Sequence, residues 1–115
     1  MTIERIKVGP RMSQAVIHGA TVYLAGQVAD DPSADVADQT RQILAKIDGL
    51  LAEAGTDKSK VLSANVWLSD ISTFDQMNAV WDEWVSPGNP PARATVESKL
   101  ARPQFKVEIM VVAAR

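Results

Sequence analysis

The sequence predicts an α+β fold in which two helices cover one face of a mixed β-sheet. Six segments alternate apolar with polar residues or are rich in β-branched residues, which is typical of strands. Two others carry apolar residues at three- and four-residue spacing, which is typical of amphipathic helices. The segments follow one another in the order β-β-β-α-β-α-β-β with no linker between them, so residues 1–115 are expected to form one domain.

Three strands are expected before the first helix. The first is Ile3 to Val8, and the runs Gln14 to His18 and Val22 to Gln27 are separated by three turn residues, a spacing that predicts a hairpin. Gly26 lies in the third run, where a glycine often marks a bulge or a close approach of the backbone to another group.

The first helix is expected to begin after Asp35, which can cap it, and to end before Gly55. Its apolar stripe consists of Val36, Thr40, Ile43, Leu44, Ile47, Leu51 and Ala54. The adjacent acids Asp30 and Asp31 suggest a metal site, but no further oxygen ligands stand at a defined spacing, so a solvated turn is favoured.

A fourth strand is expected from Val61 to Ser69, with two different faces. One face carries Leu62, Ala64, Val66 and Leu68, and the other carries Val61, Ser63, Asn65 and Trp67. The second face is neither dry nor fully polar, which suits a subunit interface or a pocket wall.

The second helix is expected to open at Ser72-Thr73-Phe74-Asp75, which resembles a capping box. Its inner stripe consists of Phe74, Met77, Trp81 and Trp84, and the two tryptophans are interpreted as core rather than as a ligand platform. Asn78 borders this stripe and could turn its amide around the edge of the helix.

The fifth strand, Ala92 to Glu97, follows Pro90-Pro91 and presents Arg93 and Thr95 on one face. An arginine held on a strand beside a hydroxyl can bind a carboxylate through two parallel hydrogen bonds. The alternative is a solvated charge that protects the edge of the sheet from aggregation, and the pattern alone favours this alternative.

The last strand, Lys106 to Ala113, is apolar on both faces except at Lys106 and Glu108. A strand that is apolar on both faces must be covered twice, and the two helices can cover only one face. We therefore expect an oligomer in which sheets of neighbouring chains pack together.

The composition excludes several classes of function. The chain has no cysteine, which excludes thiolate chemistry, and its single histidine, His18, to which no role is assigned, argues against a multi-histidine metal site. The net charge of −2 and the scattered lysines and arginines argue against nucleic-acid binding. Neither a signal-peptide pattern nor an apolar run of about 20 residues is present, so a cytoplasmic protein without membrane contact is expected.

Several short motifs together resemble the RidA/YjgF/YER057c/UK114 family over nearly the whole chain. They are Gly9-Pro10, Ser13-Gln14-Ala15-Val16, Leu24-Ala25-Gly26-Gln27, Pro91-Ala92-Arg93 and Lys106-Val107-Glu108-Ile109. The resemblance implies a chorismate-mutase-like fold and a homotrimer in which sheets face inward, helices lie outside and ligand clefts lie between neighbours.

The resemblance also implies an activity, the hydrolysis of reactive enamines and imines such as 2-aminoacrylate to 2-oxo acids and ammonia, without metal or cofactor. In this reading Arg93 holds the carboxylate of a small substrate and Glu108 positions the attacking water. Asn78 and Gly26 fall on two further positions of the family's site.

Three site positions depart from the family's pattern. Met12 replaces a tyrosine, Thr95 a common cysteine and Ala25 a frequent serine, so the substrate, or turnover itself, could differ. The alternative function is a non-catalytic module that binds a small carboxylate in the same cleft, and the alternative role of Glu108 is an ion pair with Lys106 or Arg93. The ribonuclease activity sometimes attached to this family finds no support in an acidic chain without a basic patch.

Overall fold

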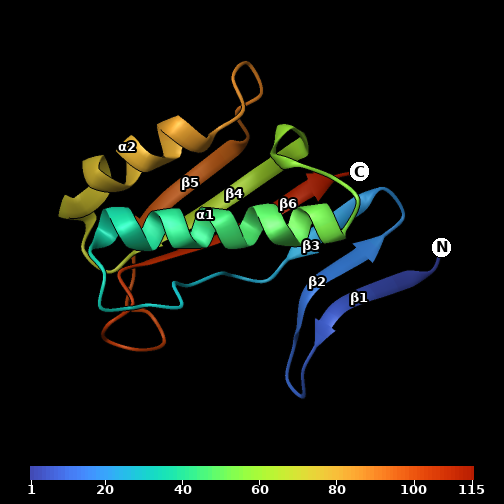
Figure 1. Cartoon of the computed structure of the whole chain (residues 1–115), viewed down its shortest axis with the longest axis horizontal. Coiled ribbons are helices and arrows are strands. Elements are labelled where there is room, and N and C mark those ends of the chain that lie inside the picture. The colour runs from blue at the N-terminus through green and yellow to red at the C-terminus, as the bar shows by residue number, and fades with distance from the viewer.

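A computed structural model describes residues 1–115 and confirms the α+β fold (Figure 1). The elements in chain order are β1 Ile3–Val8, β2 Ser13–His18, β3 Thr21–Leu24, α1 Val36–Glu53, β4 Val61–Leu68, α2 Phe74–Trp84, β5 Ala92–Glu97 and β6 Val107–Ala114. Short 3₁₀ turns at Lys58–Lys60 and Ile71–Thr73 precede β4 and α2.

The six strands form one sheet in the order β1-β2-β3-β6-β4-β5. All neighbouring pairs are antiparallel except β4 and β5, which run parallel and are connected through α2. The last strand of the chain therefore lies in the middle of the sheet, and β5 forms a free edge.

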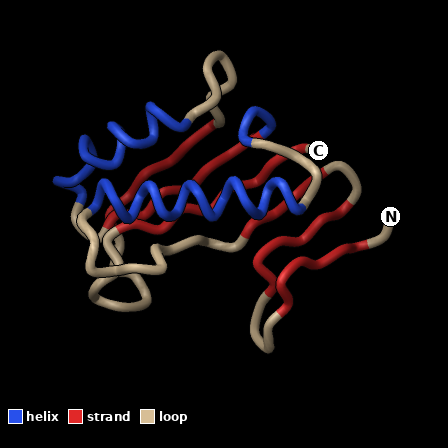
Figure 2. The backbone as a smooth tube through the Cα atoms, in the orientation of Figure 1, coloured by secondary structure: helices blue, strands red, loops and turns tan.

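Both helices lie on the same side of the sheet, so the molecule has two layers (Figures 1 and 2). The molecule measures 43 × 37 × 20 Å along its principal axes. The shortest dimension equals the thickness of one layer of helices packed on one sheet. The hydrophobic core lies between the layers and includes 22 buried residues, drawn mainly from both helices and from the strands β2, β3, β4 and β6. Neither helix is both long enough and apolar enough to cross a lipid bilayer.

The boundaries predicted for α1 are confirmed by its caps. The Asp35 side chain accepts a hydrogen bond from the Asp38 N–H, and Gly55 follows the helix in the left-handed conformation, with φ of +81°. Inside the helix, the buried side chain of Gln39 donates to the carbonyls of Pro32, Ala34 and Gln104 and accepts from the Lys106 N–H. One side chain thus ties the loop before α1 to the loop before β6.

Two strand predictions need correction. The run Val22 to Gln27 is not one strand, because β3 ends at Leu24 and Gln27 forms an isolated bridge with Ile109 of β6. Tyr23 pairs with Val112 and Gln27 pairs with Ile109. The segment from Tyr23 to Gln27 is therefore one residue longer than the segment of β6 that it faces, and the extra residue forms a bulge in the region of Gly26.

The second correction concerns β4. Leu62 was expected on the face of Ala64, Val66 and Leu68, but its side chain is 54% exposed, whereas Val61 is buried. The pairing of β4 with β6 shifts by one residue between Val61 and Ser63. Because side chains alternate between the two faces of a sheet, this shift moves the side chains of Val61 and Leu62 to the faces opposite to those predicted.

The capping box predicted for α2 is wrong. Thr73 is the N-cap residue and makes no side-chain capping bond, and Ser72 lies in the preceding 3₁₀ turn. Asp70 caps that turn, accepting hydrogen bonds from the Ser72 N–H at 2.9 Å and from its hydroxyl at 2.7 Å. The predicted inner stripe also changes, because Phe74 is 38% exposed while Val80 is buried.

The second face of the sheet has no cover within the chain. Along β6 the residues Val107, Ile109, Val111 and Ala113 are completely buried beneath the helices. The alternate residues, from Glu108 to Ala114, are only half-buried. Apolar side chains such as Tyr23 and Val96, which neighbour β6 and β4 in the register, are about half exposed on this open face.

Candidate functional site

Arg93 lies on the edge strand β5, on the helix-covered face of the sheet. The parallel register sets it beside Ala64 and sets Thr95 beside Val66, and both β4 residues are buried beneath the helices. Arg93 and Thr95 are half-buried, whereas Ala92, Ala94 and Val96 between and around them are exposed. The alternation predicted for this strand is therefore confirmed.

The guanidinium of Arg93 rests against aromatic side chains of α2. Its Cζ lies 5.0 Å from the centre of the Trp81 ring and 5.9 Å from the centre of the Phe74 ring, both within reach of a cation–π interaction. Its Nη1 lies 3.9 Å from the Met77 sulfur. Phe74, Met77 and Trp81 are three and four residues apart, so one face of α2 supplies all three contacts.

No carboxylate of the chain forms an ion pair with Arg93, since the four ion pairs involve other residues. Burial lowers the pKa of Arg93, and the charge of Asp82 partly opposes this effect. The guanidinium hydrogen-bonds no oxygen of its own chain. It is therefore partly desolvated and keeps its paired N–H donors available to a ligand.

Two other predicted site residues lie close to Arg93 in the fold and lack partners. The Thr95 hydroxyl oxygen is buried without a hydrogen-bond partner, which is rare for a buried polar atom. Asn78 is half-buried, follows the Arg93 contact Met77 in α2, and makes no side-chain hydrogen bond. The chain itself therefore provides no oxygen partner for the Arg93 guanidinium and no hydrogen-bond partner for the Thr95 hydroxyl or the Asn78 amide.

Glu108 and Gly26 form a separate group on the open face. Glu108 pairs with Trp67 in the β4–β6 register, and burial raises the pKa of its carboxyl group. A Cβ on Gly26 would lie 2.1 Å from the Glu108 Oε2, so the glycine is required for the carboxylate to approach the backbone this closely. Glu108 makes no ion pair with Arg93 or Lys106, because the Lys106 ammonium donates to the Ala34 carbonyl instead.

A single chain does not bring these two groups together. Arg93, Thr95 and Asn78 belong to the helix-covered face and its edge, whereas Glu108 and Gly26 belong to the open face. Met12 lies in the turn before β2, where it is 50% exposed. A shallow depression of about 300 Å³ reaches round the β5 edge between the faces, lined by Ser63, Asn65, Ala92, Arg93 and Ala94 among others.

Phe74 and Trp81 were not identified as site residues from the sequence. Their helical spacing predicted a stripe facing inward, and Trp81, at 5% exposure, belongs to the core as expected. The same stripe also faces β5, a pairing that only the tertiary fold supplies. An arginine on an edge strand preceded by an aromatic-rich helix is the signal that could have indicated it.

Comparison with known proteins gives consistent results. The family model described as Endoribonuclease L-PSP matches residues 2–115. A RutC family protein of Haemophilus ducreyi is 47% identical over 112 residues, covering 97% of this chain and 96% of its own.

Solved structures show the same likeness. A member of the YjgF protein family from Neisseria meningitidis superposes with a TM-score of 0.97 at 43% identity, covering 100% of this chain and 96% of its own. A protein of the Rid family from Yersinia pestis superposes with a TM-score of 0.87 at 31% identity, covering 94% of this chain and 90% of its own. From its sequence, its six-stranded sheet and these matches, the chain belongs to the RutC/YjgF/Rid family.

Proposed function

We propose that this protein hydrolyses reactive 2-imino and 2-enamino acids to 2-oxo acids and ammonia, in a cleft between two copies of the chain. Arg93 carries the proposal, because its half-buried guanidinium has aromatic neighbours and no oxygen partner in its own chain. Such a group suits a planar carboxylate, which accepts two parallel hydrogen bonds from it.

The second half of the site is Glu108 with Gly26, supplied by a neighbouring copy. The half-exposed apolar residues of the open face favour packing against another sheet, and we propose a homotrimer on the family pattern. In this arrangement Arg93, Thr95 and Asn78 of one copy face Glu108 and Gly26 of the next. Met12, in the turn before β2, lies at the border of this cleft.

The reaction needs orientation and proton transfer, and these side chains can provide both. Arg93 fixes the carboxylate and so directs the imine carbon toward a water molecule, an orientation effect. Glu108 accepts a proton as the water oxygen bonds to that carbon and passes it to the nitrogen, which gives a carbinolamine. It then carries the remaining hydroxyl proton to the nitrogen, so the C=O bond forms as the C–N bond breaks and ammonia leaves. A 2-enamino acid reacts in this way as its imine tautomer. General-base assistance of this kind contributes about 10²–10⁴-fold in rate.

The raised pKa of Glu108 supports this role, because a carboxyl group exchanges protons most effectively when its pKa lies closer to the working pH. Thr95 occupies the position of the family's thiol, and its buried hydroxyl has no hydrogen-bond partner in its own chain.

A second function, capture of a small carboxylate without turnover, is favoured by one observation. Met12 and Ala25 replace a phenol and a hydroxyl that would contact the substrate, while Arg93 is retained. Such a module would bind 2-oxo acids through Arg93, and Glu108 would have no catalytic role.

One experiment separates the two functions. An amino-acid oxidase generates imines in the presence of the protein, and trapping by semicarbazide measures how fast each imine disappears. We expect the wild type to accelerate the loss, Arg93→Ala to abolish it, and the exposed Arg102→Ala to behave as the wild type. Binding of pyruvate by the wild type with no acceleration for any imine would establish the capture function instead.

A further inference from the structure

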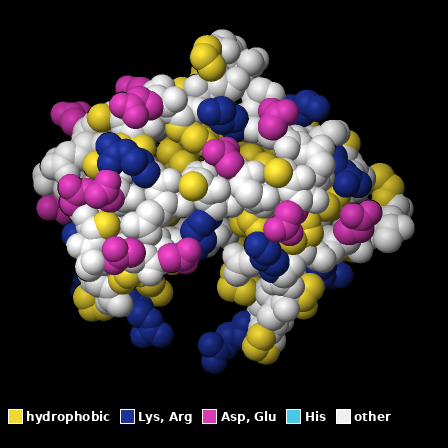
Figure 3. All heavy atoms as spheres, viewed as in Figure 1, with side chains coloured by type: hydrophobic (Ala, Val, Ile, Leu, Met, Phe, Trp, Pro, Cys, Tyr) yellow, Lys and Arg dark blue, Asp and Glu magenta, His cyan; other side chains and the backbone are white.

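A second cavity lies between α1 and the N-terminal hairpin, apart from Arg93 and Glu108. It has a volume of about 350 Å³, which is within the usual range of small-molecule sites. Seven of its eight lining residues are not hydrophobic, and they include Lys7, Gln27, Asp30, Lys46 and Glu53. In Figure 3 the surface is indented between the hairpin and the rest of the molecule on this side.

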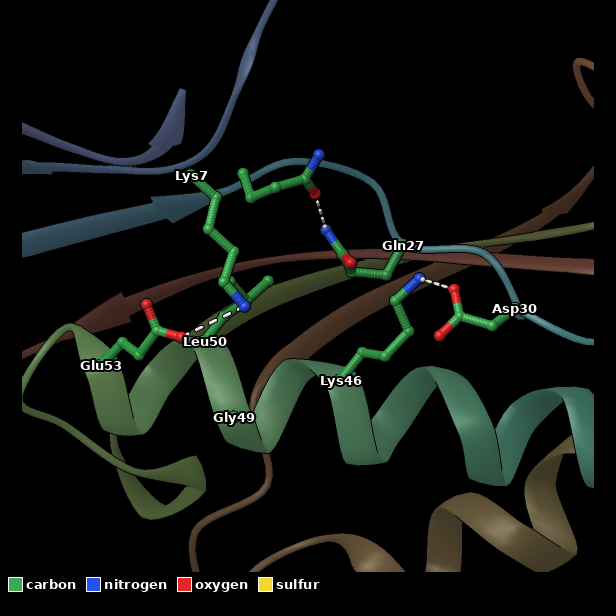
Figure 4. A pocket seen from close by; sticks show the side chains of 8 residues that line it. Lys7, Gln27, Asp30, Lys46, Gly49, Leu50 and Glu53 are labelled. Carbon is green, nitrogen blue, oxygen red and sulfur yellow. Dashed lines mark hydrogen bonds and ion pairs between the residues drawn. The ribbon is translucent and has the colours of Figure 1, made fainter. Parts of the chain in front are cut away.

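Two ion pairs occupy opposite parts of this cavity (Figure 4). The Lys7 Nζ of β1 lies 3.2 Å from Glu53 of α1, and the Lys46 Nζ of α1 lies 2.9 Å from Asp30. Lys46 is also fixed by a 2.9 Å hydrogen bond to the Val28 carbonyl, and its side chain is 32% exposed. Lys7 has only Glu53 as a partner, and with 60% exposure of its side chain it is the freer of the two cations.

Between the two pairs lies an acceptor that the chain leaves unused. Gln27 is 3% exposed, and its amide nitrogen donates to the Ala25 carbonyl at 3.0 Å and to the Gln14 Oε1 at 2.9 Å. The Ala25 carbonyl can only accept, so it fixes which end of the Gln27 amide is nitrogen. The Gln27 Oε1 accepts no hydrogen bond and faces the space between the lysines (Figure 4).

The backbone of Lys7 is unusual as well. Its φ of +52° makes it the one residue other than glycine in the left-handed region, although it belongs to a strand. This conformation is unfavourable for a lysine and is more common at ligand-binding positions than elsewhere.

The charges indicate which ligand fits. A simple anion bound to Lys7 would leave the Glu53 carboxylate unpaired, and a simple cation bound to Glu53 would leave Lys7 unpaired. A ligand with one charge of each sign can replace both partners of the exposed Lys7–Glu53 pair, whose own contribution to stability is small. An ammonium group would also supply the donor that the Gln27 oxygen lacks.

We propose that this cavity binds a small zwitterion, a free α-amino acid, independently of the Arg93 site. The carboxylate of the amino acid bonds to Lys7, and its ammonium group bonds to the Gln27 Oε1 and to Glu53. The ligand thereby joins β1 to the C-terminal part of α1.

The test is calorimetric titration of the whole protein with single amino acids, alanine first, alongside propionate and ethylamine as ligands with one charge each. We expect at least one amino acid to bind, and propionate and ethylamine to bind at least about tenfold more weakly. Equal binding of propionate, or no heat from any amino acid up to roughly 10 mM, overturns the proposal.

Variants locate the site. Lys7→Gln and Glu53→Gln change only exposed side chains and should each weaken amino-acid binding about tenfold or more. Lys60→Gln makes the same charge change on an exposed lysine without an ion pair, and together with Arg93→Ala should leave the affinity unchanged. Loss of binding in Arg93→Ala with retention in Lys7→Gln would instead place the amino acid in the Arg93 cleft.

Discussion

The guanidinium of Arg93 lies over the ring of Trp81, and on the proposed function this contact should affect substrate affinity. The cation–π interaction at 5.0 Å is expected to contribute about 1 kcal/mol to keeping Arg93 in place. Trp81→Leu should therefore raise KM about fivefold with little change in kcat, whereas Trp81→Phe, which keeps an aromatic face, should lie nearer the wild type. Steady-state kinetics with imines of two sizes measures both constants, and an unchanged KM in Trp81→Leu contradicts this role.

Glu108 is the residue whose loss should affect turnover rather than binding. Glu108→Gln keeps the size of the side chain but removes the base, so kcat should fall at least about tenfold while pyruvate affinity stays nearly constant. The wild-type rate should rise with pH through the raised pKa of Glu108, because the carboxylate form is the base. This acidic limb should be absent from the residual rate of the variant.

The same pKa makes a prediction about stability. The folded-state pKa of Glu108 is raised above 4.5, so the folded state binds the proton more tightly than the unfolded state. Its contribution to folding stability is therefore lost as the pH rises above about 4.5. Glu108→Gln should raise Tm at pH 7 relative to the wild type, and by less at pH 4, as measured by thermal melts at both values.

At the scale of elements, the bulge after β3 places Gly26 against Glu108. Gly26→Ala would bring a methyl group to 2.1 Å from the Glu108 Oε2, and the flexible end of the glutamate can move away. The fold should persist while kcat falls, and in a double-mutant cycle with Glu108→Gln the two losses should be far from additive. Additive losses would show that Gly26 acts through another group.

The elements differ in how far the sequence predicts them. α1 was predictable from end to end because its determinants, the Asp35 cap, the apolar stripe and Gly55, are all local. The bulge that exposes Leu62 was not, since it arises from the pairing of β4 with β6, more than 40 residues away. Asp70 was missed as a cap because a 3₁₀ turn intervenes before α2 and shifts the helix start.

The candidate site was predictable only in part. The alternation of β5 placed Arg93 and Thr95 on one face, as found. That Glu108 lies on the opposite face follows from the registers of β5 with β4 and of β4 with β6, which the sequence pattern does not determine. The aromatic support of Arg93 likewise depends on how α2 packs beside β5.

At the scale of the whole molecule, a site shared between copies makes a testable prediction. Arg93→Ala and Glu108→Gln are each expected to be inactive or nearly so, and mixed oligomers can combine the intact Arg93 of one chain with the intact Glu108 of its neighbour. Co-expression should restore about a quarter of the wild-type activity on random mixing, because each half is intact in about half of the copies. Sedimentation should show a trimer in every case, and no recovery in mixed trimers would place both residues in a site within one chain.

The position of β6 has a consequence for synthesis of the protein on the ribosome. Because Val107–Ala114 lies between β3 and β4, the strands made earlier can pair only as two separate groups, β1-β2-β3 and β4-β5, until β6 is available. Each of them meanwhile exposes an unpaired edge and the apolar surface that β6 will cover. The sheet and its core are therefore completed in one step, when β6 pairs with both groups of strands, and until then their open edges favour aggregation.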